Sequence, residues 1–167
     1  MKKIVLLSDS HGYLDQAIEN HLAWADEVWH AGDIGSTTVS DRIKALKPLR
    51  AVYGNVDGHQ LRVEFSENEI FECEGVHVLM THIGGYPKKY NARVRELIRK
   101  HRPQLYICGH SHILKVIYDK DLDLLHLNPG AVGRSGFHKI RTLLRFCLTA
   151  GKIENLEVVE LGPRSST

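Results

Sequence analysis

A pattern that recurs five times constrains the fold of this chain more than any other feature. Each time, an apolar stretch runs into a short polar motif that contains glycine, and the five motifs are SDSHG, AGDIG, YGNVDG, MTHIGG and CGHSH. Glycine lets the backbone bend sharply at such points and approach a ligand closely. Because ligands of open α/β sheets bind at the carboxyl ends of the strands, the five loops are predicted to meet at one place.

The first third of the chain predicts strands that alternate with helices. KKIVLLS, DEVWHAGD and LRAVYGN are apolar stretches of strand length. The two segments between them have apolar residues at helical spacing, and the second, TTVSDRIKALK, carries a capping pattern from Thr38 to Asp41. A β-α-β-α-β order is typical of a mostly parallel sheet with helices packed on it.

The second half of the chain predicts short strands and hairpin-like turns around one helix. That helix is expected from about Tyr90 to His101, with Tyr90 on its apolar face and Pro103 as its stop. The predicted strands lie in NEIFECEG, VHVLMTHIGG, QLYICGHSH, LKVIYDKDLDLLHLN, RTLLRFCLTAG and KIENLEVVEL. Two β-layers enclosed by helices would account for this mixture.

Length and composition limit what the protein can be. With 167 residues and 43% hydrophobic content, one domain is expected over residues 1–162, followed by a frayed tail at 163–167. A formal charge of +2 does not by itself indicate a nucleic-acid partner. The apolar run at residues 4–7 is too short for a signal peptide or a membrane span, so a cytoplasmic protein is expected. Cys73, Cys108 and Cys147 form no CxxC pair and are expected to be buried thiols.

The candidate ligands combine carboxylate oxygens, an amide oxygen and imidazole nitrogens, without a thiolate. This donor set suits Mn, Fe, Co, Ni or Zn, and it suits Mg or Ca less well because of the imidazoles. Seven residues are too many for one ordinary metal site, whereas two ions that share Asp33 as a bridge would use all of them. The seven are Asp9, His11, Asp33, Asn55, His82, His110 and His112.

The joint set of motifs resembles the calcineurin-like metallophosphoesterases, whose signature reads D-x-H, G-D, G-N-x-D/E, a later H and G-H-x-H. Within that superfamily, the short length and the GNVD and NPGA stretches are similar to the small YfcE-type phosphodiesterases. The resemblance runs from about Lys3 to Val132. It implies an α/β fold, a four-layer α-β-β-α sandwich with two mixed β-sheets.

The resemblance also implies a metal-dependent phosphoesterase, and within the YfcE-type group a phosphodiesterase that uses two divalent ions such as manganese. A hydroxide that bridges the two ions would attack the phosphorus, and Asn55 would help to stabilise charge on the phosphoryl oxygens. The phosphate-ester substrate could be a nucleotide or a nucleic acid. The ligands implied for the first ion are Asp9, His11 and His112, with Asp33 as the bridge, and those implied for the second are Asn55, His82 and His110.

One position departs from the family pattern. Many relatives have a histidine in the third motif, suited to protonating the leaving group, where this chain has Val56. His59 is the nearest substitute by sequence and is a candidate proton donor, although a histidine in a surface loop is the commoner interpretation. Asp57 is expected to support its neighbours or the turn, and His30 either bonds a metal ligand or packs in the core.

Other interpretations compete with this one. Each ligand alone has an ordinary explanation, such as a helix cap for Asp33 or a turn for Asn55, but the whole set in this order does not. The basic stretch at 88–102 could steer phosphorylated substrates, yet a solvated helix face is commoner. Two alternative functions remain: a phosphomonoesterase, and a catalytically weak Vps29-like interaction scaffold on the same fold. An aspartyl-phosphate phosphatase would need a second aspartate where His11 stands.

Overall fold

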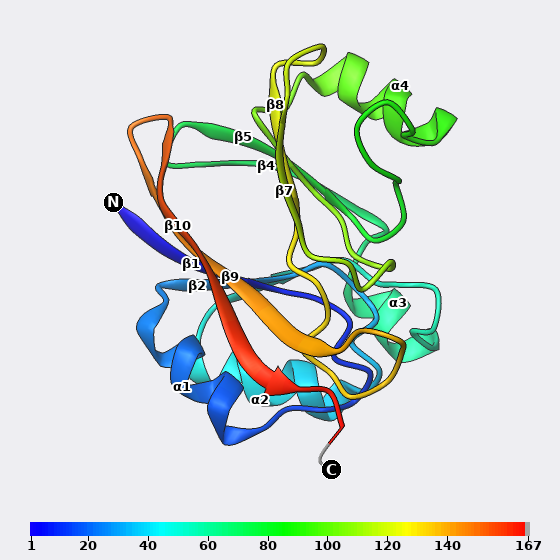
Figure 1. The fold of residues 1–167 in the computed structure, drawn as a ribbon, viewed down its shortest axis with the longest axis vertical. Helices are drawn as coiled ribbons and strands as arrows, with labels where there is room; N and C mark the ends of the chain where they lie inside the picture. The colour runs from blue at the N-terminus through cyan, green and yellow to red at the C-terminus, as the bar shows by residue number, and fades with distance from the viewer. Residues whose placement is uncertain (166–167) are drawn as a thin grey trace.

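The structure is a computed structural model that describes residues 1–165, and over that range the strands form two five-stranded mixed sheets (Figure 1). The first sheet has the order β10 (Lys152–Pro163), β9 (Ile140–Thr149), β1 (Lys2–Leu7), β2 (Glu27–His30) and β3 (Leu49–Ala51). The second has the order β4 (Asn68–Cys73), β5 (Val76–Thr81), β6 (Leu105–Ile107), β8 (Leu124–Asn128) and β7 (Lys115–Asp119). The helices are α1 (Gln16–Trp24), α2 (Thr37–Leu46), α3 (His59–Glu64) and α4 (Ala92–His101).

Each sheet contains three neighbouring parallel strands. In the first sheet β1, β2 and β3 are parallel, β9 runs antiparallel to β1, and the edge strand β10 runs antiparallel to β9. In the second sheet β5, β6 and β8 are parallel, and β4 and β7 form antiparallel edges. The parallel strands bring their carboxyl ends to one edge of each sheet, which is where polar loops can meet.

Three apolar clusters fill the spaces between four layers. Alternation along β1 places Ile4 and Leu6 in the cluster between the two sheets, and Val5 and Leu7 in the cluster beneath α1 and α2. A third cluster packs α4 on the outer face of the second sheet, through side chains such as Ile98. Figure 1 shows α1 and α2 at one end of the molecule and α4 at the other. The predicted four-layer α-β-β-α sandwich is therefore confirmed.

Several local predictions need correction. α4 begins after Asn91, whose side chain accepts a hydrogen bond from the Val94 N–H at 2.9 Å, so Tyr90 lies before the helix although it is buried against it. Ser36 is the N-cap residue of α2, whereas Thr38 already lies inside the helix. His59 begins the short helix α3 and does not lie in a loop.

The chain remains anchored beyond residue 162. Pro163 pairs with Ile140 at the end of β10. The Arg164 N–H donates to the Lys139 carbonyl at 2.9 Å, and its guanidinium donates to the His138 carbonyl at 2.9 Å. The predicted start of a frayed tail at residue 163 is thus too early, and residues 166–167 lie outside the described residues.

Two further expectations concern the cysteines and the membrane. All three cysteines are buried free thiols, as predicted. None of the helices in the described part of the chain has the length and apolar content that crossing a membrane requires.

Candidate metal centre

The seven predicted ligands all lie in loops that follow parallel strands. Asp9 and His11 follow β1, while Asp33 follows β2. The other residues come after β3, β5 and β6 and are Asn55, His82, His110 and His112. Both sheets contribute, so the site lies where their carboxyl edges meet.

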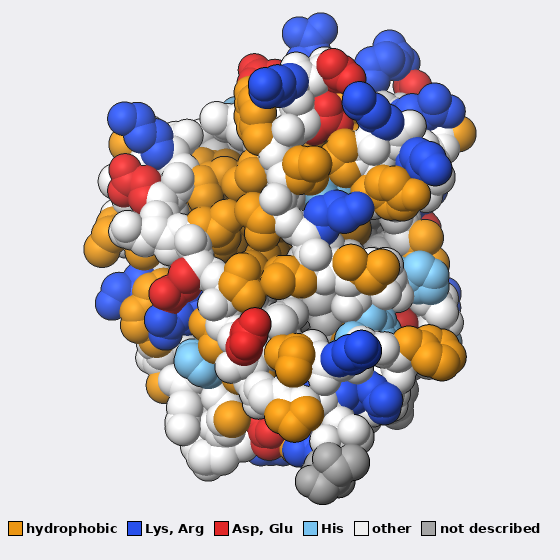
Figure 2. Space-filling view, in the orientation of Figure 1, with side chains coloured by type: hydrophobic (Ala, Val, Ile, Leu, Met, Phe, Trp, Pro, Cys, Tyr) orange, Lys and Arg blue, Asp and Glu red, His pale blue; other side chains and the backbone are white. Residues whose placement is uncertain are grey.

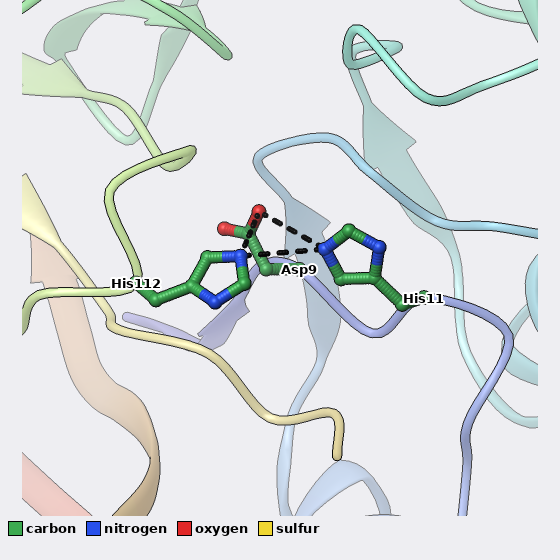
Figure 3. A group of neighbouring side chains, drawn as sticks. All are labelled: Asp9, His11 and His112. Carbon is green, nitrogen blue, oxygen red and sulfur yellow. Dashed lines mark hydrogen bonds and ion pairs between the residues drawn. The ribbon is translucent and has the colours of Figure 1, made fainter. Parts of the chain in front are cut away.

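Asp9, His11 and His112 form the first candidate ligand group, which could hold a metal ion. Oδ1 of Asp9 lies 3.2 Å from Nε2 of His112 and 3.7 Å from Nε2 of His11, and the two imidazole nitrogens are 3.3 Å apart. Figure 3 shows both rings presenting Nε2 to the carboxylate. Within residues 1–165, this buried Oδ1 atom accepts no hydrogen bond. A buried carboxylate oxygen without a donor is costly unless a cation binds it.

Asp33, Asn55, His82 and His110 form the second ligand group. Oδ2 of Asp33 lies 3.1 Å from Nε2 of His82. Oδ1 of Asn55 lies 3.1 Å from the same nitrogen and 3.0 Å from Nδ1 of His110. Two oxygens and two imidazole nitrogens thus converge from four different loops.

The tautomer of His82 supports a cation in this second group. Its Nδ1 atom lies 2.7 Å from the Ala31 carbonyl, which can only accept, so Nδ1 carries the proton. In the neutral ring Nε2 then carries a lone pair, and this lone pair faces the oxygens of Asp33 and Asn55. A metal ion would satisfy all three atoms, and a histidine whose other nitrogen bonds a carbonyl is a common metal ligand.

Two carboxylates lie between the groups. Oδ2 of Asp33 is 3.7 Å from Nε2 of His11, and Oδ1 of Asp9 is 3.9 Å from Nε2 of His82. Asp33 therefore occupies the position that a bridging ligand needs, and Asp9 reaches both groups as well. The bridging role of Asp33 stays a prediction.

The second oxygen of each carboxylate is held by the protein. Oδ2 of Asp9 accepts hydrogen bonds from the Ser8 hydroxyl at 2.6 Å and the His110 N–H at 3.1 Å. Oδ1 of Asp33 accepts from the Val56 N–H at 3.0 Å. These bonds turn the remaining oxygen of each carboxylate toward the histidines. Ser8 therefore acts as a positioning residue, and Val56 contributes through its backbone.

The ligands are held in an unusual backbone conformation. Five of the seven have a positive φ, a region that costs energy for residues other than glycine. Glycines allow the loops to pack tightly around them: a Cβ atom on Gly54 would lie 2.1 Å from Oδ1 of Asp33. The five are Asp9 at 55°, His11 at 46°, Asp33 at 55°, His110 at 70° and His112 at 60°.

The charges of the two groups are strongly coupled. Burial alone would raise the pKa of Asp9, but the facing imidazoles of His11 and His112 bring it below its ordinary value. Burial opposes the protonation of His82, yet the hydrogen bond that its protonated ring donates to the Asp33 carboxylate raises its pKa. The site thus favours ionised carboxylates that face a positive charge. Without metal, protonated histidines supply that charge, and a bound divalent cation would supply it instead.

Asp57 joins the loops that carry the second group. It is 2% exposed, and its Oδ1 accepts from the Gly35 N–H at 2.8 Å. Its Oδ2 accepts from the N–H groups of Gly54 at 2.8 Å and Ile34 at 3.2 Å. Because these partners flank both Asp33 and Asn55, the Asp57 carboxylate fixes the separation of two candidate ligands.

His30 supports the loop of the first group. The Gly32 N–H donates to its Nδ1 at 3.1 Å, which leaves the proton on Nε2 to donate to the Ser10 hydroxyl at 2.9 Å. Burial lowers the pKa of His30 to about 4, so the ring is neutral. Ser10 lies between Asp9 and His11, and in turn donates to the Ile34 carbonyl at 2.9 Å. His30 therefore orders the loop between two ligands without bonding either ligand side chain.

Two histidines outside the ligand groups differ in their placement. His59 is exposed at the start of α3, and among the described residues no hydrogen bond or ion pair joins it to a ligand. His138, which belongs to no motif, lies with its ring edge-on to His112 at 5.2 Å between centroids. Its Nε2 donates to the Gly133 carbonyl at 2.9 Å. No sequence signal identified His138 as a neighbour of the site.

The last part of the basic stretch at 88–102, which follows the fourth ligand loop, lies away from the candidate ligands. Arg99, Lys100 and Arg102 lie at the end of α4, just before β6 begins, whereas the ligands follow the opposite end of β6. Figure 2 shows basic side chains gathered at the end of the molecule where α4 lies. Cations at a helix C-terminus also suit the helix dipole. These observations favour a solvated helix face over substrate steering for this part.

Comparison with known proteins identifies the family. Residues 1–151 match the model of the calcineurin-like phosphoesterase superfamily domain. A probable metallophosphoesterase of Methanothermobacter thermautotrophicus is 28% identical over 134 residues, which are 77% of this chain and 76% of that protein.

Solved structures agree with this match at the level of the fold. A single mutant of Vps29 from Entamoeba histolytica has a TM-score of 0.74 at 16% identity and covers 96% of this chain and 99% of its own. A structure described as a novel archaeal phosphodiesterase has a TM-score of 0.71 at 21% identity, covering 95% of this chain and 99% of its own. Since the family model spans nearly the whole chain, the protein belongs to the calcineurin-like phosphoesterase superfamily.

Proposed function

We propose that the protein is a phosphodiesterase that works with two divalent transition-metal ions, with manganese as the first metal to test. The observation that carries this proposal is the convergence of two ligand groups on the carboxylates of Asp9 and Asp33, with the buried Oδ1 of Asp9 left without a hydrogen-bond donor. Nucleotides and nucleic acids are the substrate classes to test first.

The ions would supply an activated water molecule near neutral pH and would offset charge on the phosphoryl oxygens. Asp9, His11 and His112 would hold one ion and Asp33, Asn55, His82 and His110 the other. Oδ1 of Asn55 faces the imidazoles, which leaves the amide N–H₂ free to donate to a phosphoryl oxygen. Attack by water breaks the P–O bond to the leaving group, whose oxygen then needs a proton. His59 is the proposed donor of that proton.

The test combines metal analysis with hydrolysis assays. The purified protein should contain, or take up, about two metal ions per chain and should hydrolyse bis(4-nitrophenyl) phosphate with Mn²⁺ added. Asp33→Ala should lose about a thousandfold in kcat/KM, because metal-assisted charge stabilisation provides several kcal/mol. Asp41→Ala, an exposed position on α2, is the matched control. Protein that binds no metal and is inactive with Mn, Co, Ni and Zn would contradict the proposal.

Two alternatives have distinct outcomes in the same assays. A higher kcat/KM for 4-nitrophenyl phosphate than for the diester would indicate a phosphomonoesterase. A Vps29-like interaction scaffold is favoured by the structural similarity over 96% of the chain. Such a scaffold predicts metal binding without turnover of either ester, whereas the complete ligand set favours catalysis.

A further inference from the structure

A cavity of about 390 Å³ opens beside the second ligand group, and the proposed mechanism leaves it without a role. His110 belongs both to the cavity wall and to that ligand group. The neighbouring Gly109 also lines the cavity, and its backbone packs against the side chains of Ser8 and Asp9. A substrate whose phosphorus lies at the metal ligands would therefore have this cavity directly beside one of its ester groups.

The rim of the cavity is apolar. Ile83 and Tyr86, from the loop after β5, are 40% and 43% exposed, and Ile113, from the loop after β6, is 62% exposed. Large apolar side chains gathered at the edge of a polar site are typical of a ligand-binding groove. An aromatic ring between aliphatic side chains is suited to a planar apolar group.

The floor of the cavity is rigid and uncharged. His126 is 1% exposed, and its Nδ1 lies 3.1 Å from the Tyr90 hydroxyl. Its ring packs against Tyr90 and Tyr106 at centroid distances of 5.7 and 5.3 Å. Burial and the nearby charge of Lys115 lower the pKa of His126 to about 4, so the ring stays neutral at physiological pH.

Lys115 supplies the one positive charge that no carboxylate offsets among the described residues of the cavity wall. Its Nζ lies 4.2 Å from the centroid of the Tyr86 ring, a cation–π contact that holds the ammonium beside the aromatic side chain. The ion pairs of residues 1–165 do not include Lys115, and its side chain is partly buried. An ammonium without a counter-ion favours an anionic or carbonyl oxygen of a ligand.

We propose that this cavity binds one ester group of the substrate, and that the group is a planar aromatic ring with an acceptor oxygen at its far edge. Tyr86 and Ile113 contact the faces of the ring, and Lys115 donates to the acceptor oxygen. This assignment rests on the proposed function, because the phosphoryl group must bind at the metal ligands for the ester group to reach the cavity. Tyr86, Ile113 and Lys115 are therefore the residues that determine which esters are accepted.

Phosphonates test the cavity without turnover, since their C–P bond is not hydrolysed. We would measure by calorimetry the affinity of the manganese-loaded protein for methylphosphonate, phenylphosphonate and 4-carboxyphenylphosphonate. All three share the phosphoryl group, so methylphosphonate is the internal reference for the metal site. Phenylphosphonate should bind about tenfold tighter than methylphosphonate or better, because its ring is buried.

Variants of the cavity residues separate their contributions to phosphonate affinity. Tyr86→Ala and Ile113→Ser should bring the phenyl-to-methyl affinity ratio close to one, whereas Tyr118→Ala, an exposed tyrosine on β7, should retain it. The carboxylate of 4-carboxyphenylphosphonate should add about fivefold in affinity over phenylphosphonate. Lys115→Met should abolish that gain, and the exposed Lys120→Met should keep it. Because Ile113 is 62% exposed, its substitution tests the cavity even if Tyr86→Ala fails to fold.

The outcomes distinguish this inference from the proposed function. Equal affinities of the wild-type protein for methylphosphonate and phenylphosphonate would overturn the cavity assignment and leave the phosphoryl site intact. Binding of none of the three phosphonates would overturn the phosphoryl site itself, and with it the role of the cavity. An unchanged phenyl-to-methyl ratio in both Tyr86→Ala and Ile113→Ser would place the aromatic group elsewhere.

Discussion

Nε2 of His82 lies 3.1 Å from Oδ2 of Asp33, although His82 follows a strand of the second sheet and Asp33 follows a strand of the first. The contact joins the two sheets at their shared edge. The apolar cluster between the sheets sets how closely they approach, with Leu6 on one side and Met80 on the other. The geometry of the candidate metal centre therefore depends on the central core as well as on the loops.

Asp57 should matter for stability and for activity together. Asp57→Ala leaves the N–H groups of Gly35, Gly54 and Ile34 without their acceptor, which we expect to cost about 2–4 kcal/mol of unfolding free energy. The loosened loops should reduce metal affinity and kcat/KM by about 10- to 100-fold. Urea unfolding and manganese titration measure the two effects, with exposed Asp41→Ala as the control. A stable variant with wild-type metal affinity would show that Asp57 does not position the ligands.

Gly54 and Gly58 provide a matched pair in one loop. A Cβ atom on Gly54 would lie 2.1 Å from Oδ1 of Asp33, whereas one on Gly58 would meet nothing within 4 Å. Gly54→Ala should displace the Asp33 carboxylate, with a loss of about 1–3 kcal/mol in stability and about tenfold or more in metal affinity. Gly58→Ala should stay close to the wild type in both measurements. Equal effects in the two variants would refute the argument from packing.

Manganese should stabilise the protein through Asp9. At a hundred times Kd, a bound ion adds about 2.7 kcal/mol, which raises the Tm of a domain of this size by about 5–10 °C. Asp9→Asn should strongly reduce this rise, because the neutral amide lacks the negative charge of the buried Oδ1 that the ion would bind. Differential scanning calorimetry with and without Mn²⁺ provides the comparison. A metal-dependent rise in Asp9→Asn as large as that of the wild type would exclude Asp9 as a ligand.

The sequence predicted the fold and the residues that meet at the site because both depend on local patterns. Each candidate ligand stands in a glycine-containing motif that follows an apolar strand, so its place near a strand end follows from the strand itself. Asn55, for example, follows β3 within the YGNVDG motif. Knowing that these ends converge required the order of the motifs along the whole chain.

The features that the sequence missed depend on contacts between distant segments. α3 has only six residues and one buried side chain, Leu61, so no helical periodicity could develop over its length. His138 contacts His112 only because the loop between β8 and β9 folds back over the site. The cavity wall likewise brings Tyr86, from the loop after β5, next to Lys115 at the start of β7, and no motif links the two.

The buried His126 should make the stability of the metal-free protein depend on pH. Its pKa is lowered from 6.5 to about 4, so between these values the unfolded chain binds a proton that the folded protein does not. The free energy of unfolding should therefore fall by up to about 3 kcal/mol from this group as the pH drops from 6.5 to 4. His126→Gln should reduce this slope, and the exposed His77→Gln should not. His30 acts in the same direction, so part of the slope should remain.

The proposed proton donor can be tested through the leaving group. 4-Nitrophenolate is stable as an anion and needs little protonation, whereas phenolate is more basic and depends on a proton donor. His59→Gln should therefore lower kcat/KM for diphenyl phosphate by about 100-fold and for bis(4-nitrophenyl) phosphate by no more than about threefold. Gln60→Ala, the next exposed residue of α3, is the control for local disturbance of the helix. Equal losses with both esters would mean that His59 affects binding or folding, and that the leaving oxygen takes its proton from water or another side chain.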